Sequence, residues 1–132
     1  MTEQTAQAEF VITSWEEDPV VADAAGSVTR TRVVKQFSGD ITGTSEAWLV
    51  MSVVDDSHMA YCGAERFDVT LDGRAGGFVL LHDAVNDGAS GHARWVVQGG
   101  SGTGGLTGLA CTAEIDRRED GGHGFTLHYA LV

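Results

Sequence analysis

Three side chains in the middle of the sequence combine residue types that can exchange protons: Tyr61, Glu65 and His82. In the run 61–71, the odd positions are mostly apolar and include Glu65. Alternate residues of a strand share one face, so we expect Glu65 to point inward with its apolar neighbours. A buried carboxylate loses hydration, which raises its pKa unless a cation or several donors compensate. Such a group can serve as a general acid or base.

His82 could complete a pair with this carboxylate. It alternates with Phe78 and Leu80, but both faces of the run 76–85 contain apolar residues, so the pattern leaves its direction open. A hairpin closed around residues 72–74 would place His82 on the strand next to Glu65. If His82 points inward, the two groups could orient each other and divide the acid and base roles, with Tyr61 as a polar partner. A structural carboxylate paired with an arginine or a backbone amide, and a hydrogen-bonded packing histidine, are the alternatives.

Other kinds of catalytic chemistry find little support in the sequence. No two of the five histidines have the spacing of a metal site, and we expect neither a metal nor a cofactor. The G-x-S-x-G nucleophile motif does not occur. Cys62 and Cys111 form no CxxC pair, and we expect both to be reduced thiols.

The elements that must position these groups are strands. Eighteen glycines and one proline separate runs with period-2 alternation and many β-branched or aromatic residues, and helical periodicity is nearly absent. We predict a single all-β domain over residues 1–132, an eight-stranded antiparallel up-and-down β-barrel, with a β-sandwich as the alternative. The acidic segment 16–26 is expected to be a loop or one helical turn over a barrel end. The expected strands are residues 9–15, 28–37, 45–54, 59–71, 76–85, 92–97, 106–115 and 124–132.

Alternation within these runs also predicts the walls of the barrel interior. Trp95 shares its phase with Ala93 and Val97, which places it inside. The phase of Trp48 does not decide its side. Lys35 shares the phase of Val33 and is expected to reach a barrel mouth rather than to neutralise Glu65. The further positions expected to face inward are Phe10, Ile12, Val33, Phe37, Leu109, Ile115, Phe125, Leu127, Tyr129 and Leu131. The residues predicted to contact a ligand are Phe37, Phe67, Trp95, Trp48, Tyr129 and Cys111.

The glycine-rich stretch 99–109, GGSGTGGLTGL, contains the spacing G-x-G-x-x-G. In a dinucleotide-binding fold, this motif opens a helix, whereas residues 106–115 have the pattern of a strand. No Lys-Ser or Lys-Thr pair follows, which argues against a phosphate-binding P-loop. We therefore interpret the glycines as a corner of the barrel, where positive φ and close backbone contacts are needed.

Part of this stretch carries a family resemblance. Gly102-Thr103-Gly104 resembles the entry into a late strand of allene oxide cyclases and plant dirigent proteins, which are antiparallel eight-stranded barrels. The whole chain is similar to a bacterial family of uncharacterised proteins in the allene-oxide-cyclase-like barrel superfamily. This resemblance implies the barrel fold and, because relatives include dimers and trimers, an assembly, but it transfers no site residue. The segments that carry it are FSGDITGTSE (37–46), YCGAERF (61–67), LDGRAGGFVLLH (71–82), GSGTGGLTGL (100–109) and LHYAL (127–131).

Charge and composition limit the partners. The net charge of −11 argues against nucleic acid and against anionic membranes, because both would be repelled. No apolar run approaches the length of a membrane span, and the N-terminus lacks the pattern of a signal peptide, so we expect a cytoplasmic protein. Outward apolar residues predict a homo-oligomer, namely Val34, Val79, Leu81 and Val96.

Two functions are compatible with this sequence. The first is a barrel without cofactor that binds a small hydrophobic molecule and acts on it as a cyclase or isomerase, with Glu65, His82 and Tyr61 as the reacting groups. The second is a binding or scaffold protein without chemistry, similar to the dirigent proteins, or a barrel filled by its own side chains. A pocket of about 300 Å³ or more that touches Glu65 would favour the first function.

Overall fold

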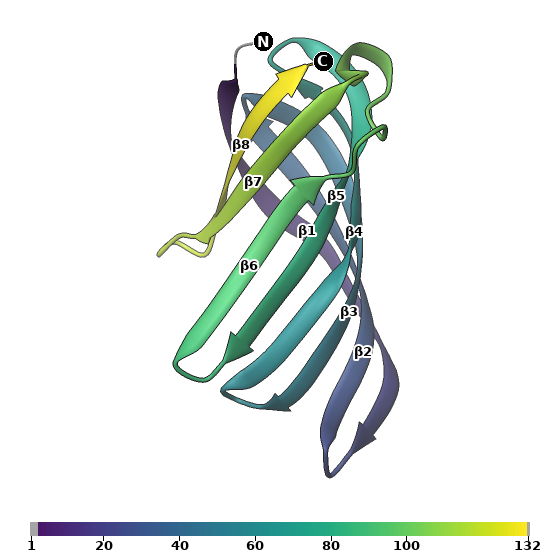
Figure 1. Ribbon diagram of the computed structural model, residues 1–132, viewed down its shortest axis with the longest axis vertical. Coiled ribbons are helices and arrows are strands. Elements are labelled where there is room, and N and C mark those ends of the chain that lie inside the picture. Colours follow the sequence, from purple (N-terminus) through teal and green to yellow (C-terminus); the bar gives the residue numbers. More distant parts are fainter. Residues whose placement is uncertain (1–2, 132) are drawn as a thin grey trace.

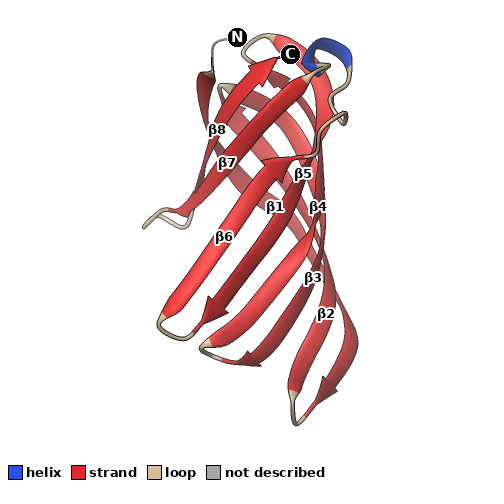
Figure 2. Ribbon diagram, viewed as in Figure 1, coloured by secondary structure: helices blue, strands red, loops and turns tan. Residues whose placement is uncertain are grey.

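The computed structural model describes residues 3–131, and eight antiparallel strands dominate it (Figures 1 and 2). Each strand pairs with the next along the chain, and the last pairs with the first, so the sheet closes on itself as a ring. A short 3-10 helix, η1 (Gly104–Leu106), lies between the sixth and seventh strands. The strands are β1 (Gln4–Asp23), β2 (Gly26–Gly39), β3 (Ile41–Asp55), β4 (His58–Leu71), β5 (Arg74–Asp87), β6 (Ser90–Val97), β7 (Leu109–Arg117) and β8 (His123–Leu131).

The number and order of the strands agree with the sequence prediction, but several strands are longer than predicted and two segments differ in kind. The segment 16–26 is neither a loop nor a helical turn, since β1 continues to Asp23 and pairs with β2 down to Gly26. Pro19 has no amide hydrogen to donate to a neighbouring strand. It is tolerated here because β1 is an edge strand at this point, with β2 as its single neighbour. Residues 106–108 precede β7 instead of opening it. Val132, the predicted last residue of the eighth strand, lies outside the described residues.

The ring closes over only part of its height. On one side of the seam, β1 pairs with β8 from Gln4 to Phe10; on the other, the β6–β7 pairing comprises Trp95–Ala113 and Val96–Thr112. Beyond these positions, β1 pairs only with β2, and β6 only with β5. Figure 1 shows β2 to β5 extending well below the β7–β8 hairpin. We call the part that includes β7 and β8 the upper half, and the lower part, formed by β1 to β6, the trough.

Side chains fill the upper half. Phe67 stacks on Phe78 with ring centroids 4.4 Å apart, and Phe37 lies 5.2–5.4 Å from the rings of Phe10, Phe67 and Phe125. Aromatic pairs at these separations add to the hydrophobic free energy of the core. The upper half is therefore a packed core and not an open lumen.

The glycine-rich connector closes this upper end. Its backbone pairs with β5, because the Thr103 N–H donates to the Gly77 carbonyl at 2.9 Å and the Gly77 N–H donates to the Thr103 hydroxyl at 3.0 Å. Gly76 permits this contact, since a Cβ there would lie 2.0 Å from the Thr103 carbonyl oxygen. Leu106, at the end of η1, is fully buried. The stretch predicted to be a strand corner is thus a cap over the end of the ring.

Candidate functional site

Four consecutive strands contribute one polar side chain each to a cluster inside the ring. Lys35 comes from β2, Ser45 from β3, Glu65 from β4 and His82 from β5, and all four are buried. Each alternates with apolar inward residues, so period-2 geometry directs it to the interior. Ala47, the partner of Glu65 in the β3–β4 register, provides space for the larger side chains because it is small.

Glu65 is the centre of this cluster and has no solvent exposure. Its Oε1 accepts hydrogen bonds from His82 Nε2 at 2.7 Å and from Lys35 Nζ at 3.2 Å. Its Oε2 accepts a hydrogen bond from the Ser45 hydroxyl at 2.5 Å. The Lys35 ammonium also lies 4.5 Å from the centroid of the Phe10 ring, a favourable position for a cation. Both carboxylate oxygens are therefore satisfied within the protein.

The surroundings of Glu65 act on its pKa in opposite directions. Burial raises the pKa, but the hydrogen bond from His82, the positive charges of Lys35 and His82, and the hydrogen bond from Ser45 together outweigh it. The net result is a pKa below the ordinary value of a glutamate. The carboxylate is thus ionised at neutral pH, which suits a proton acceptor or an orienting group better than a proton donor.

Two buried nitrogen atoms beside this cluster have no hydrogen-bond partner among the described residues: His82 Nδ1 and Trp95 Nε1. His82 and Trp95 are direct partners in the β5–β6 register and face the same side of the sheet. The Trp95 N–H is close enough to the Tyr61 hydroxyl to favour its ionised form and so lower its pKa, although the two groups do not meet the geometry of a hydrogen bond. Burial, together with the charge of Glu65, nevertheless keeps the pKa of Tyr61 above its ordinary value.

The trough contains two apolar cavities next to these groups. The larger, of about 620 Å³, lies on the inner face of β3 to β6. The smaller, of about 200 Å³, lies where the trough meets the upper half, adjoins the polar cluster and includes Lys35 and His82 in its wall. Met51 and Tyr61 line both cavities, so the two form a continuous apolar surface. Other side chains in these walls include Trp95, Ala84 and Ala93 in the larger cavity, and Trp15, Val33 and Ile115 in the smaller one.

The structure brings together the three residues predicted to carry acid–base chemistry. Glu65 and His82 share a hydrogen bond, and the Tyr61 and His82 rings are 6.2 Å apart. Glu65 does not line either trough cavity. Its hydrogen-bond partners His82 and Lys35 line the smaller one, so the larger cavity does not provide the expected pocket in contact with Glu65. The prediction for Lys35 is wrong: it neutralises Glu65 instead of reaching a mouth, because the carboxylate lies within reach of its ammonium.

Of the residues predicted to contact a ligand, only some line the trough cavities. Trp95 lines it, whereas Trp48 is on the outer face, 57% exposed, with its Nε1 donating to Glu46. The reason is register, since Ala47 and Leu49 occupy the inward positions of β3 and leave Trp48 outside. Phe67 belongs to the packed upper half. We therefore remove Trp48 and Phe67 from the set of predicted ligand contacts.

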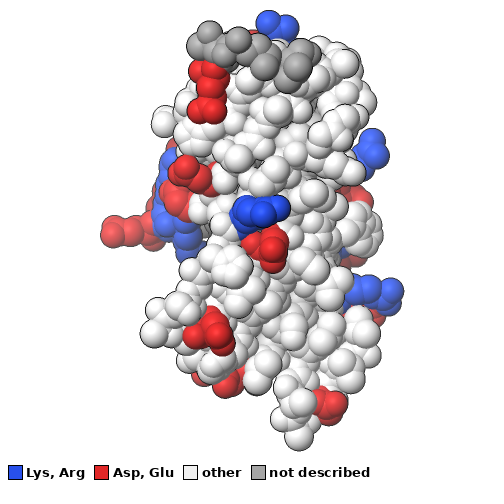
Figure 3. All heavy atoms as spheres, viewed as in Figure 1, with Lys and Arg blue, Asp and Glu red and all other residues white. Residues whose placement is uncertain are grey.

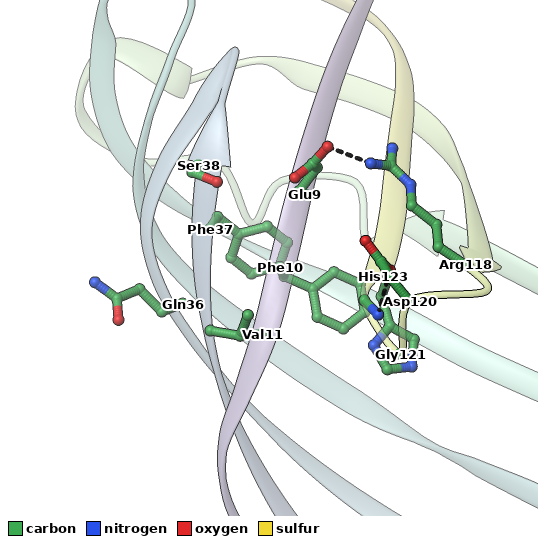
Figure 4. Close-up of a pocket in the computed structure, with 11 residues that line it drawn as sticks. Glu9, Phe10, Val11, Gln36, Phe37, Ser38, Arg118, Asp120, Gly121 and His123 are labelled. Carbon is green, nitrogen blue, oxygen red and sulfur yellow. Dashed lines mark hydrogen bonds and ion pairs between the residues drawn. The ribbon is translucent and has the colours of Figure 1, made fainter.

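Three further predicted contacts lie away from the trough cavities. The Tyr129 hydroxyl donates to Asp72 Oδ2 at 2.5 Å near the upper end, and burial raises its pKa to about 12. Cys111 packs against the upper core as a free thiol. Phe37, besides its core contacts, lines a separate cavity of about 480 Å³ beside the β7–β8 turn (Figure 4). There, Figure 4 shows Glu9 and Arg118 joined as an ion pair.

The sequence argument did not identify Ser45 or Met51. Ser45 is two residues before Ala47 and four before Leu49, so its inward phase could have been read, but small hydroxyl residues occupy both faces of strands. Met51 follows the same phase. What could not be read was which inward positions border a cavity and which lie in packed core, since that depends on the incomplete closure of the ring.

Figure 3 shows acidic and basic side chains interspersed on the visible face, with large areas carrying neither. Over residues 3–131, no helix has the length and apolar character needed to cross a bilayer.

Comparison with known proteins relates the chain to proteins of similar fold. A family model described as "Protein of unknown function (DUF3224)" matches residues 6–129. The crystal structure of a protein with unknown function from this family, from Shewanella oneidensis MR-1, superimposes with a TM-score of 0.87 at 22% sequence identity. The alignment covers 99% of each chain. No curated protein matches the chain at a significant level. At this identity, the structural likeness shows the fold alone.

Proposed function

We propose that this chain, which belongs to the DUF3224 family, binds one small and largely apolar molecule in the trough. The observation that carries the proposal is the continuous apolar surface of the two cavities that share Met51 and Tyr61. A cavity of about 620 Å³ is within the range of small-molecule sites, which are mostly apolar with a few placed polar groups. Tyr61 lines both cavities, whereas His82 and Lys35 lie in the wall of the smaller one only.

Exposed apolar side chains inside the trough support this proposal. Ile12, Trp15, Val53 and Met59 are each 38–47% exposed and lie in the walls of the two cavities. Leaving such side chains in water forgoes hydrophobic stabilisation, which burial under an apolar ligand would recover. The resemblance to allene oxide cyclases adds one element to the proposal. It implies that the trough would restrict the conformation of a flexible ligand.

The test compares two neighbouring residues of β3. Met51 faces the trough, and Val50 faces outward and is 45% exposed. We expect the fluorescent probe 1-anilinonaphthalene-8-sulfonate to bind the native protein, Met51→Arg to abolish this binding, and Val50→Arg to leave it unchanged. Circular dichroism and urea unfolding establish that both variants are folded. Equal binding to both variants would overturn the trough as the site.

A second function, proton-transfer catalysis by a cofactor-independent isomerase or cyclase, is favoured by one observation. His82 lines the smaller cavity and donates through Nε2 to an ionised carboxylate, while its buried Nδ1 has no partner among the described residues. An imidazole oriented in this way can accept a proton from a bound molecule. Without such chemistry, the same geometry serves a binding or scaffold protein.

Bound compounds distinguish the two functions. Wild type and Glu65→Gln are purified from the same cells, and the small molecules that they retain are compared by chromatography and mass spectrometry. Catalysis predicts that the variant retains an isomer different from the compound retained by wild type. The same compound in both would favour binding without chemistry.

Self-association remains part of the proposal. Leu81, on the outer face of β5, is 43% exposed, and its neighbours Val79 and Val96 are half-buried. Contact with a second copy would remove these side chains from water. Light scattering of the native protein and of Leu81→Glu tests this, since a monomeric mass for the native protein would exclude the assembly.

A further inference from the structure

Two unpartnered polar atoms point to the chemical class of the bound molecule. His82 Nδ1 and Trp95 Nε1 are buried without a hydrogen bond, although they belong to directly paired residues of β5 and β6. Buried polar atoms are nearly always hydrogen-bonded, and leaving one unsatisfied is unfavourable. Both residues line the trough cavities, His82 the smaller and Trp95 the larger. A molecule bound beside His82 would have to reach the buried Nδ1, and at Trp95 it would compete with the neighbouring Tyr61 hydroxyl for the Nε1–H.

The directions of these bonds follow from the cluster around Glu65. The ionised carboxylate only accepts, so His82 Nε2 carries a hydrogen and donates to it. Lys35 already supplies a positive charge against the single negative charge of Glu65. When Nε2 carries the only ring hydrogen, Nδ1 is an acceptor. The indole Nε1 of Trp95 is always a donor.

One acceptor on His82 and one donor on its paired residue Trp95 match a hydroxyl group, which donates one hydrogen and accepts another. We propose that the ligand of the trough is an apolar alcohol or phenol whose hydroxyl donates to His82 Nδ1 and accepts from the Trp95 Nε1–H. This inference rests on the proposed function and adds the polar group of the ligand to it. A thioether, ether or hydrocarbon would leave His82 Nδ1 without a donor.

Three naphthalenes of similar size test the inference: 2-naphthol, 2-methoxynaphthalene and 2-methylnaphthalene. Their affinities are measured by displacement of 1-anilinonaphthalene-8-sulfonate, with direct calorimetry as a check. The naphthol can donate and accept, the methoxy compound can only accept, and the methyl compound can do neither. We expect 2-naphthol to bind about tenfold more tightly than 2-methylnaphthalene, as one net hydrogen bond in a buried site provides.

Variants identify the atoms responsible. Trp95→Phe removes the N–H and keeps an aromatic ring, while Trp48→Phe makes the same change on the outer face. His82→Gln can still donate to Glu65 but offers no ring acceptor. We expect Trp95→Phe and His82→Gln to reduce the preference for 2-naphthol to about threefold or less, and Trp48→Phe to preserve it.

The outcomes separate the two proposals. If all three compounds bind with equal affinity to wild type, the trough binds apolar molecules and the hydroxyl inference is overturned. If none of them binds and the fluorescent probe does not bind either, the proposed function itself fails. If the preference survives in both Trp95→Phe and His82→Gln, the hydroxyl is recognised elsewhere and the inference is also overturned.

Discussion

Removing the positive charge beside Glu65 is the most direct test of the buried cluster. In Lys35→Met, the carboxylate keeps its hydrogen bonds from His82 and Ser45 but loses its cation. The methionine retains an unbranched apolar side chain next to Phe10, so packing changes little. Breaking a buried ion pair by removing one partner typically costs about 3–5 kcal/mol. Because two donors remain, we expect a loss of about 3 kcal/mol in the free energy of unfolding at pH 7.

The same reasoning predicts how this loss depends on pH. In the native protein, the pKa of Glu65 is below its value in the unfolded chain, so the folded state binds fewer protons and stability falls as pH drops through the two values. Without Lys35, the pKa of the folded carboxyl rises towards or above the unfolded value, so acid costs the variant less. The stability gap between native protein and variant should therefore be largest near neutral pH and narrow on acidification below about pH 5.

Urea unfolding followed by circular dichroism measures both effects, since urea does not screen charges as guanidinium does. The double variant Lys35→Met with Glu65→Gln removes both charges and should recover much of the lost stability. Arg30→Met, which breaks an ion pair with Asp18 between side chains that are about two-thirds exposed, is the matched control and should cost far less. A Lys35→Met variant as stable as Arg30→Met, with no dependence on pH, would refute the electrostatic account of the cluster.

Two further predictions concern the upper half. Leu106→Ala should destabilise the protein by about 2–5 kcal/mol, because Leu106 is fully buried under the glycine-rich cap, whereas Val50→Ala on the outer face should have a small effect. A similar midpoint of urea unfolding for both variants would contradict the capping role. Cys111 should react slowly with iodoacetamide at pH 8, since burial raises its pKa to about 12, while the exposed Cys62 reacts first; mass spectrometry of the labelled peptides measures the order, and faster labelling of Cys111 would show that the upper core opens readily.

The separation between packed and open parts of the ring bears on both candidate functions. A barrel filled along its whole length would leave no room for a ligand, and an entirely open one would lack a rigid support for Glu65. Here, the aromatic core above the cluster holds β2 to β5 in register, and the trough below gives access to His82 and Tyr61. Whether a bound molecule reacts there depends on the unpartnered Nδ1, which is why the Glu65→Gln comparison is informative.

Alternation along the chain was sufficient to predict eight strands in order and the inward face of β4, including Glu65, because side-chain direction in a strand is a local property with a period of two residues. It could not determine that His82 points inward, since both faces of β5 are apolar, or that Trp48 points outward. Those directions, and the ion pair of Lys35 with Glu65, follow from the register among β2, β3, β4 and β5. The short β6–β7 pairing, which leaves the trough open, is likewise a property of the closed sheet. Contacts between strands distant in sequence are decided by how the whole ring closes, and no local pattern records them.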